Sequence, residues 1–109
     1  MIANIFTDIP VDSAAKSGAE LFQNLATGRH ARIERIISKG QSSEPGHWYD
    51  QTEAEWVMLM QGAATLSFAD GEEICLAAGD YVVIAAGRKH RVAWTDPDVV
   101  TLWLAVHYT

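Results

Sequence analysis

The residues best suited to carry chemistry lie in two separate stretches of the chain. The first is G-H-W-Y-D-Q-T-E-A-E over residues 46–55, which is polar and aromatic and ends at Glu55. The second is G-R-K-H, which ends at His90. A carboxylate and an imidazole in one cavity form either an acid/base pair or part of a transition-metal site. We therefore predict a pocket organised around Glu55 and His90.

A catalytic metal site needs about three protein ligands and an open position. Glu55 and His90 supply two, so a third must come from the neighbouring polar stretch. The candidates are His47 (imidazole), Tyr49 (phenolate), Asp50 (carboxylate) and Gln51 (amide oxygen). The alternative is purely structural: a buried Glu55 simply pairs with His90 or a nearby arginine, because an unpaired buried carboxylate is costly.

The elements that must position these groups are short apolar segments separated by turn formers. There is no helical period and no alternation of strands with helices, which indicates an antiparallel β-barrel or sandwich of about eight strands. Asp70-Gly71 is a strong hairpin signal. Residues 31–37 are predicted as a strand with one wet face, and residues 55–60 as a strand buried on both faces. The remaining predicted segments are 4–6 (a short strand), 8–18 (loop), 20–25 (strand or helical turn), 64–68, 73–77, 81–84, 91–94 and 99–106.

The composition excludes several classes of partner. The 109 residues suffice for one domain, and the net charge of −6 with no basic stripe argues against nucleic acid and anionic membranes. No apolar run approaches the roughly 20 residues of a membrane span, and the first residues lack a signal-peptide pattern, so we expect a cytoplasmic protein. Cys75 stands alone and is expected to be a small buried hydrophobe. Trp48, Trp94 and Trp103 are candidates to line the cavity.

Two glycine-bounded motifs resemble those of the cupin superfamily of small jelly-roll barrels. The first motif of that family reads Gly, five residues, His-X-His, three or four residues, Glu, six residues, Gly; Glu55 and Gly62 match its second half. The second reads Gly, five residues, Pro-X-Gly, two residues, His, three residues, Asn; Gly79, Gly87 and His90 match it. The resemblance implies a single-domain, cupin-type jelly-roll barrel over residues 31–109, with residues 1–30 as a strand and loop segment packing on it.

The resemblance also implies chemistry and assembly. In metal-binding cupins the ligands are the two histidines and the glutamate of the first motif and the histidine of the second. Here the His-X-His positions hold either Trp48 and Asp50 or Tyr49 and Gln51, depending on the spacing. Gln51 is the favoured third ligand, because its parity with Glu55 matches the family spacing. A homodimer is the family default, with the closing strand and the N-terminal segment as contact surfaces.

Three hypotheses for function follow. The first is a metal-dependent enzyme that holds Fe, Mn, Ni or Zn and acts on a small polar or aromatic molecule, with Tyr49 as an acid/base or orienting group. The second is a metal-free binding or sensing module, favoured by the loss of both first-motif histidines. The third is a structural barrel filled by side chains. His107 is expected to be structural, with an extra pocket ligand as the alternative. The predicted pocket residues are His47, Trp48, Asp50, Trp94 and Trp103.

Overall fold

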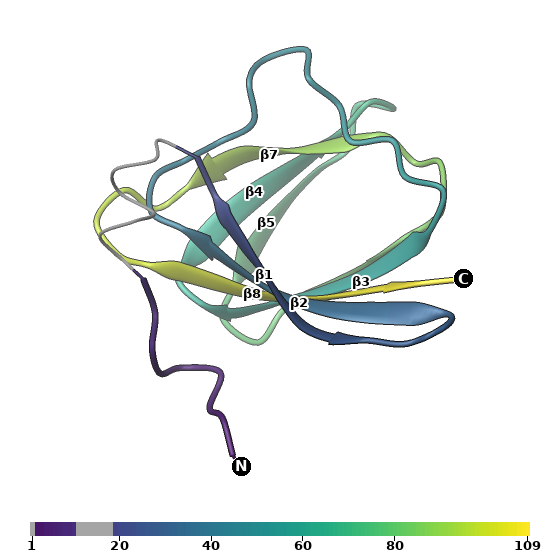
Figure 1. Ribbon diagram of the computed structural model, residues 1–109. Coiled ribbons are helices and arrows are strands. Elements are labelled where there is room, and N and C mark those ends of the chain that lie inside the picture. The colour runs from purple at the N-terminus through teal and green to yellow at the C-terminus, as the bar shows by residue number, and fades with distance from the viewer. Residues whose placement is uncertain (1, 11–18) are drawn as a thin grey trace.

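A computed structural model describes residues 2–10 and 19–109, and these residues form only strands, turns and loops (Figure 1). The described part of the chain accordingly contains no helix of the length and apolarity that crossing a membrane requires. The all-β prediction is confirmed. The eight strands are β1 (Leu21–Thr27), β2 (Ala31–Ser38), β3 (Ala54–Gln61), β4 (Ala63–Phe68), β5 (Glu73–Ala77), β6 (Tyr81–Ile84), β7 (His90–Thr95) and β8 (Thr101–Tyr108).

The strands pair into two sheets whose inner faces share one core. The larger sheet has the order β1-β2-β8-β3-β6 and the smaller one β5-β4-β7, with every pairing antiparallel. The pairing does not run continuously from one sheet to the other, so the jelly-roll prediction is supported at the level of a two-sheet, all-β fold. The closing strand β8 lies between β2 and β3, which means that its backbone cannot offer a free edge to a partner.

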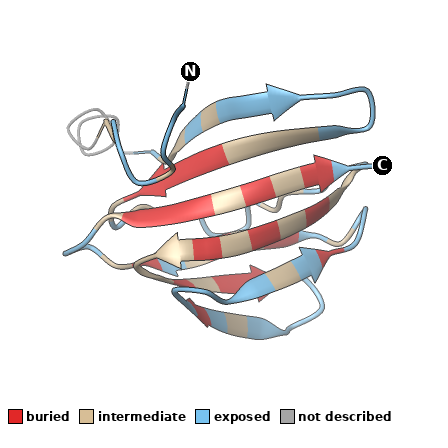
Figure 2. Ribbon diagram, turned by 90° about the horizontal axis from the view of Figure 1, so that it is seen from below, coloured by how far each residue is buried: buried red, intermediate tan, exposed pale blue. Residues whose placement is uncertain are grey.

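Alternation along the strands decides which side chains are buried. On β3, buried residues alternate with half-buried ones (Figure 2), so the prediction of burial on both faces of residues 55–60 is wrong. Cys75 is exposed, because on β5 its neighbour Leu76 takes the inward position. The buried core that joins the two sheets consists of Ile36, Val57, Leu59, Ala64, Leu66, Phe68, Leu76, Ile84, Val92, Trp103 and Ala105.

The described N-terminal residues 2–10 are held against the larger sheet by one arginine. The guanidinium of Arg35 donates hydrogen bonds to the backbone carbonyls of Ile5, Thr7 and Asp8, at 3.0, 2.7 and 3.1 Å. Residues 4–6 form a turn rather than the predicted short strand. Most of the predicted loop at 8–18 lies outside the described residues, and the division of the chain at residue 30 stays a prediction.

The turn between β3 and β4 generates a stability prediction. Gly62 has a φ of +92°, and a Cβ added there would lie 2.3 Å from Thr101 Oγ1 and 2.7 Å from Thr101 Cα. We expect Gly62→Ala to lower the free energy of unfolding by about 2–5 kcal/mol, combining the cost of a left-handed backbone with a clash against buried Thr101. The control is Gly71→Ala, where φ is +99° but no atom lies within 4 Å. Equal losses in urea unfolding for the two variants would contradict the packing argument.

Candidate functional site

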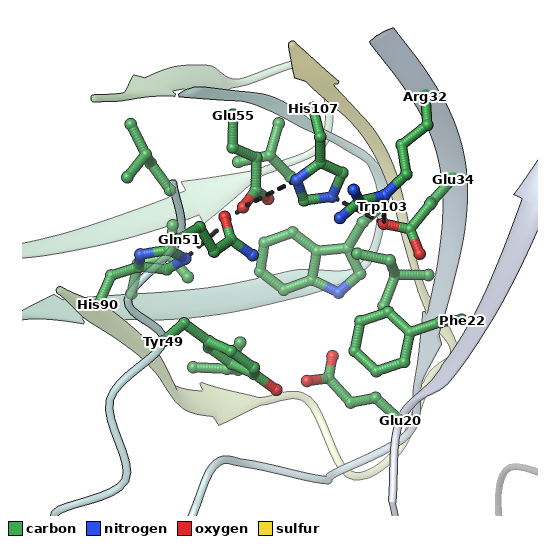
Figure 3. Close-up of a pocket in the computed structure, with 15 residues that line it drawn as sticks. Glu20, Phe22, Arg32, Glu34, Tyr49, Gln51, Glu55, His90, Trp103 and His107 are labelled. Atoms are coloured by element: carbon green, nitrogen blue, oxygen red, sulfur yellow. Dashed lines mark ion pairs between the residues drawn. The ribbon is translucent and has the colours of Figure 1, made fainter. Parts of the chain in front are cut away.

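A cavity of about 200 Å³ lies between the two sheets, beside the inner faces of β2, β8 and β3 (Figure 3). It is smaller than the roughly 300–1,000 Å³ typical of sites for drug-sized molecules. Its polar lining comes from the neighbouring strands β2, β8 and β3, from the loop that precedes β3, from His90 at the start of β7 and from Glu20 just before β1. The lining residues are Glu20, Phe22, Arg32, Glu34, Ile36, Tyr49, Gln51, Glu55, Val57, Leu66, Ile84, His90, Val92, Trp103 and His107.

Glu55 and His90 meet in this cavity, from the start of β3 and the start of β7. They are 6% and 5% exposed, and Glu55 Oε1 lies 3.6 Å from His90 Nε2. His90 Nδ1 lies 3.1 Å from the carbonyl oxygen of Arg88. Because a carbonyl can only accept, Nδ1 carries the proton, and the neutral ring turns the lone pair of Nε2 toward the carboxylate.

Two acceptors that face each other at 3.6 Å attract a positive charge between them. Burial lowers the pKa of His90, but the Glu55 carboxylate and the Arg88 carbonyl together outweigh this effect and raise it. The gap is longer than a hydrogen bond. The pair therefore favours a cation, either a proton on His90 or a metal ion shared by the two groups.

Register across the larger sheet adds His107 to this site. His107 on β8 is the pairing partner of Arg32 on β2 and of Glu55 on β3, so the three residues form one row across the sheet. His107 Nε2 lies 2.7 Å from Glu34 Oε1, whereas its Nδ1 lies 3.9 Å from Glu55 Oε1 and has no hydrogen-bond partner. Figure 3 shows the Glu55 carboxylate between the two imidazoles.

The loop before β3 presents Tyr49 and Gln51 to the cavity. An isolated bridge joins Tyr49 to His90, with backbone hydrogen bonds of 2.7 and 3.1 Å, and Gly87 N donates to the Gln51 carbonyl at 2.7 Å. The segment is thus fixed in extended form, and alternate residues face the same way. Of the two spacings that the sequence left open, the structure brings Tyr49 and Gln51 to the lining.

Four residues predicted to line the pocket lie outside its lining, and these predictions are corrected. His47 and Asp50 are exposed, and Trp48 lies with its ring 5.8 Å from the guanidinium carbon of Arg91. Trp94 is 46% exposed on β7. The alternation that brings Tyr49 and Gln51 inward turns Trp48 and Asp50 away. Trp103 does line the cavity, and its Nε1 donates to Ser38 Oγ at 3.1 Å.

The sequence reasoning missed the contribution of β2. Arg32 and Glu34 alternate with apolar residues, and this pattern predicts that both side chains face the solvent. Their side chains in fact face the cavity, where Arg32 binds Glu53 at 2.6 Å and lies 3.7 Å from Glu34. Period-two patterning cannot distinguish a polar cavity from bulk water. Glu20 and Phe22, at the start of β1, were missed because no motif marked them.

The cavity raises the pKa values of both Tyr49 and Glu20. Burial raises the pKa of Tyr49, and the nearby carboxylates Glu20 and Glu55 add to the effect against an opposing hydrogen bond with Ser43. Burial also raises the pKa of Glu20; repulsion from Glu55 adds to this, whereas the hydrogen bond donated by Ser38 opposes it. The Tyr49 hydroxyl is therefore suited to donate a hydrogen bond to a ligand rather than to act as a base.

The side chains present fit a divalent transition metal in kind. Glu55 offers an oxygen, and His90 offers an Nε2 lone pair with its other nitrogen fixed by a carbonyl, which is the usual environment of a metal-ligating histidine. The buried His107 Nδ1, which has no hydrogen-bond partner, offers a further lone pair for an ion. Within residues 2–10 and 19–109, however, no three His, Cys, Asp or Glu side chains already converge closely enough to hold an ion.

Comparison with known proteins assigns the chain to a family. The Cupin domain family matches residues 34–107. The protein therefore belongs to the cupin superfamily. No match was found among curated proteins.

Solved structures share the fold. A Ralstonia eutropha protein described as a candidate mannose-6-phosphate isomerase is 42% identical, with 99% of this chain and 97% of that chain covered and a TM-score of 0.89. A sugar phosphate isomerase of the cupin superfamily from Silicibacter pomeroyi is 22% identical over 88% and 62% of the two chains, with a TM-score of 0.67. A Desulfitobacterium hafniense cupin is 19% identical over 83% and 77%, with a TM-score of 0.69.

The raised pKa of Glu20 predicts how stability depends on pH. The folded state binds the Glu20 proton more tightly than the unfolded chain, so the free energy of unfolding falls as pH rises from about 4.3 through the raised pKa. Glu20→Gln removes this loss and keeps an acceptor for Ser38. We expect the variant to gain stability relative to wild type as pH rises from about 4 to 8 in urea titrations.

The control for this prediction is Glu44→Gln, which neutralises an exposed glutamate outside the cavity. Its stability difference from wild type should stay flat over the same pH range. A flat difference for Glu20→Gln as well would show that the Glu20 carboxyl is not perturbed by the cavity.

Proposed function

We propose that this cupin binds one divalent transition metal ion (Fe, Mn, Ni or Zn) and a small polar molecule in its cavity, and that it is a metal-dependent enzyme. Glu55 and His90 are ligands, with the amide oxygen of Gln51 as a third. The observation that carries the proposal is the buried Glu55–His90 pair, whose facing atoms are 3.6 Å apart while Nδ1 of His90 is held by the Arg88 carbonyl. Bound there, the ion would polarise a carbonyl or hydroxyl oxygen of the substrate.

The protein's own residues would orient the substrate beside that site. Tyr49, kept protonated by its raised pKa, donates a hydrogen bond to a substrate oxygen. Trp103 and Val57 supply apolar walls. Isomerisation of a small hydroxy-carbonyl compound is the reaction we favour, because the 42% identical relative is described as a candidate mannose-6-phosphate isomerase.

The lining favours an uncharged substrate over a phosphate ester. Phosphate recognition normally uses arginine, lysine or helix N-termini. The described lining contains one arginine and no lysine, and the Arg32 guanidinium already contacts Glu34 and Glu53. The same lining contains the acidic residues Glu20, Glu34 and Glu55, and each of them repels a phosphate when it is ionised. We therefore infer that the substrate is a free sugar or a similar polyhydroxy compound.

A metal-free binding module is the second candidate. It is favoured by the two first-motif positions, which hold Tyr49 and Gln51 in place of histidines, and by the lack of three converged ligands in the described residues. In that case the cation between Glu55 and His90 is a proton, and the cavity holds a polar ligand through Tyr49 and the buried carboxylate.

We also infer the family's jelly-roll barrel, a cytoplasmic location and a homodimer. The edges of the larger sheet are β1 and β6. Strand β6 exposes Tyr81 and Val83, which are 64% and 53% accessible, beside the ring of Trp56 on β3. This outward apolar surface, rather than an edge of β8, is the contact that we propose for the second copy.

Metal titration tests the proposal. Chelator-treated wild-type protein should bind about one equivalent of Zn²⁺ or Mn²⁺ in calorimetry. Glu55→Gln and His90→Gln should each weaken binding by at least about 100-fold, more than the roughly 10–100-fold loss expected when only an outer partner is removed. His47→Ala is the control, because His47 is exposed outside the cavity. Less than about a tenth of an equivalent at saturation for all four metals would leave the metal-free module as the function.

The substrate class has its own test. We expect metal-loaded protein to bind mannose at least as tightly as mannose 6-phosphate in calorimetry, because the described lining offers the phosphate no uncommitted guanidinium. A preference for the phosphate ester above about tenfold, or 1.4 kcal/mol, would overturn this inference and indicate a phosphosugar substrate.

A further inference from the structure

His107 is a buried histidine with one nitrogen bound and one left over. It is 3% exposed on β8, and its Nε2 donates to Glu34 Oε1 at 2.7 Å. Its Nδ1 has no hydrogen-bond partner and lies 3.9 Å from Glu55 Oε1. Leaving a buried polar atom unpaired destabilises the folded protein, so such an atom in a cavity wall calls for an explanation.

His107 and His90 are arranged in the same way around one carboxylate. Each imidazole has one nitrogen tied to an oxygen acceptor, Glu34 for His107 and the Arg88 carbonyl for His90. Each turns its other nitrogen toward Glu55 Oε1, at 3.9 and 3.6 Å. A hydrogen bond from the second ring nitrogen to a carboxylate or carbonyl is the common environment of metal-ligating histidines.

The backbone holds His107 in this position independently of any side-chain preference. Glu55 and His107 are direct pairing partners on β3 and β8, so their side chains leave the sheet on the same face and at the same level. The next row of the sheet, Glu34, Ala105 and Val57, places the Glu34 carboxylate one level away. Because Ala105, the cross-strand partner of Glu34, has only a methyl side chain, Glu34 can lean along the sheet to His107 Nε2.

We propose that His107 is a further protein ligand of the cation site, with Glu34 as the carboxylate that orients it. This inference rests on the proposed function and deepens it: the imidazole missing from the first-motif positions is supplied by the closing strand. Two imidazoles and one carboxylate form a set suited to Fe, Mn, Ni, Zn or Cu. Ligand atoms about 2.0–2.2 Å from one tetrahedral ion lie about 3.4 Å from each other. The distances from Glu55 Oε1 to His90 Nε2 and to His107 Nδ1, 3.6 and 3.9 Å, are only slightly longer than this. Binding of one ion also requires the two imidazoles to move toward each other.

Counting coordinated imidazoles tests this proposal directly. The chain has four histidines, of which His47 is exposed and His30 lies in the turn after β1. One equivalent of Cu²⁺ alone serves as the probe, and pulsed EPR counts the imidazoles bound to it. We expect two in wild type and in His47→Ala, and one in His107→Gln and in His90→Gln. Cu²⁺ affinity should fall by at least about tenfold in His107→Gln.

The orienting carboxylate has a matched pair of variants. Glu34→Gln should weaken Cu²⁺ binding by about 10–100-fold and leave two imidazoles bound, because the amide oxygen still accepts from His107 Nε2. Glu53→Gln makes the same chemical change at a carboxylate that pairs with Arg32 and lies outside the cavity lining; this variant should bind like wild type.

The outcomes separate this inference from the proposed function. One imidazole in wild type, lost in His90→Gln and retained in His107→Gln, would overturn the role of His107 and leave the Glu55–His90 site standing. Reduced affinity in His107→Gln with an unchanged count of two would assign His107 a structural role and also overturn the proposal. Failure of wild type to bind Cu²⁺ in the cavity would overturn this inference, and the proposed function itself falls only if Fe, Mn, Ni and Zn also fail to bind in the titration described above.

Discussion

The structure depends on how one buried carboxylate is compensated. Glu55 lies on the inner face of β3, 6% exposed, and its Oε1 is 3.6 Å from His90 Nε2 and 3.9 Å from His107 Nδ1, both beyond hydrogen-bonding distance. An ionised carboxylate in such a place is costly unless positive charge accompanies it. The raised pKa of His90 expresses the same demand, because the Glu55 carboxylate and the Arg88 carbonyl favour the charged imidazole against the opposing effect of burial.

Across the larger sheet, the polar row that carries Glu55 is followed by rows that become apolar toward the shared core. Successive rows across β2, β8 and β3 pass from Arg32–His107–Glu55, through Glu34–Ala105–Val57, to Ile36–Trp103–Leu59. The last row belongs to the shared core. The apolar rows hold the sheets together, and the polar row takes its fixed geometry from them. A rigid sheet positions ligating side chains more accurately than a loop does.

The chain's strand pattern and glycine spacings were sufficient to predict the fold class and the approach of Glu55 to His90. They could not predict which loop residues face inward, because the register of the loop is set by the Tyr49–His90 bridge, a contact distant in sequence. The position of Arg32 and Glu34 could not be predicted for a related reason. A polar residue at every second position of a strand is compatible with a polar cavity as well as with the solvent-exposed surface. The sequence alone favours a structural role for His107, because its unpaired nitrogen becomes visible only when β8 is placed between β2 and β3.

The most direct measurement is anomalous X-ray diffraction at the zinc absorption edge from crystals grown with one equivalent of Zn²⁺. The account predicts a single strong peak about 2.0–2.2 Å from Glu55 Oε1 and His90 Nε2, with the Arg88 carbonyl still accepting from Nδ1. No peak in the cavity, with His90 and Glu55 remaining as far apart as the 3.6 Å found here, would contradict it.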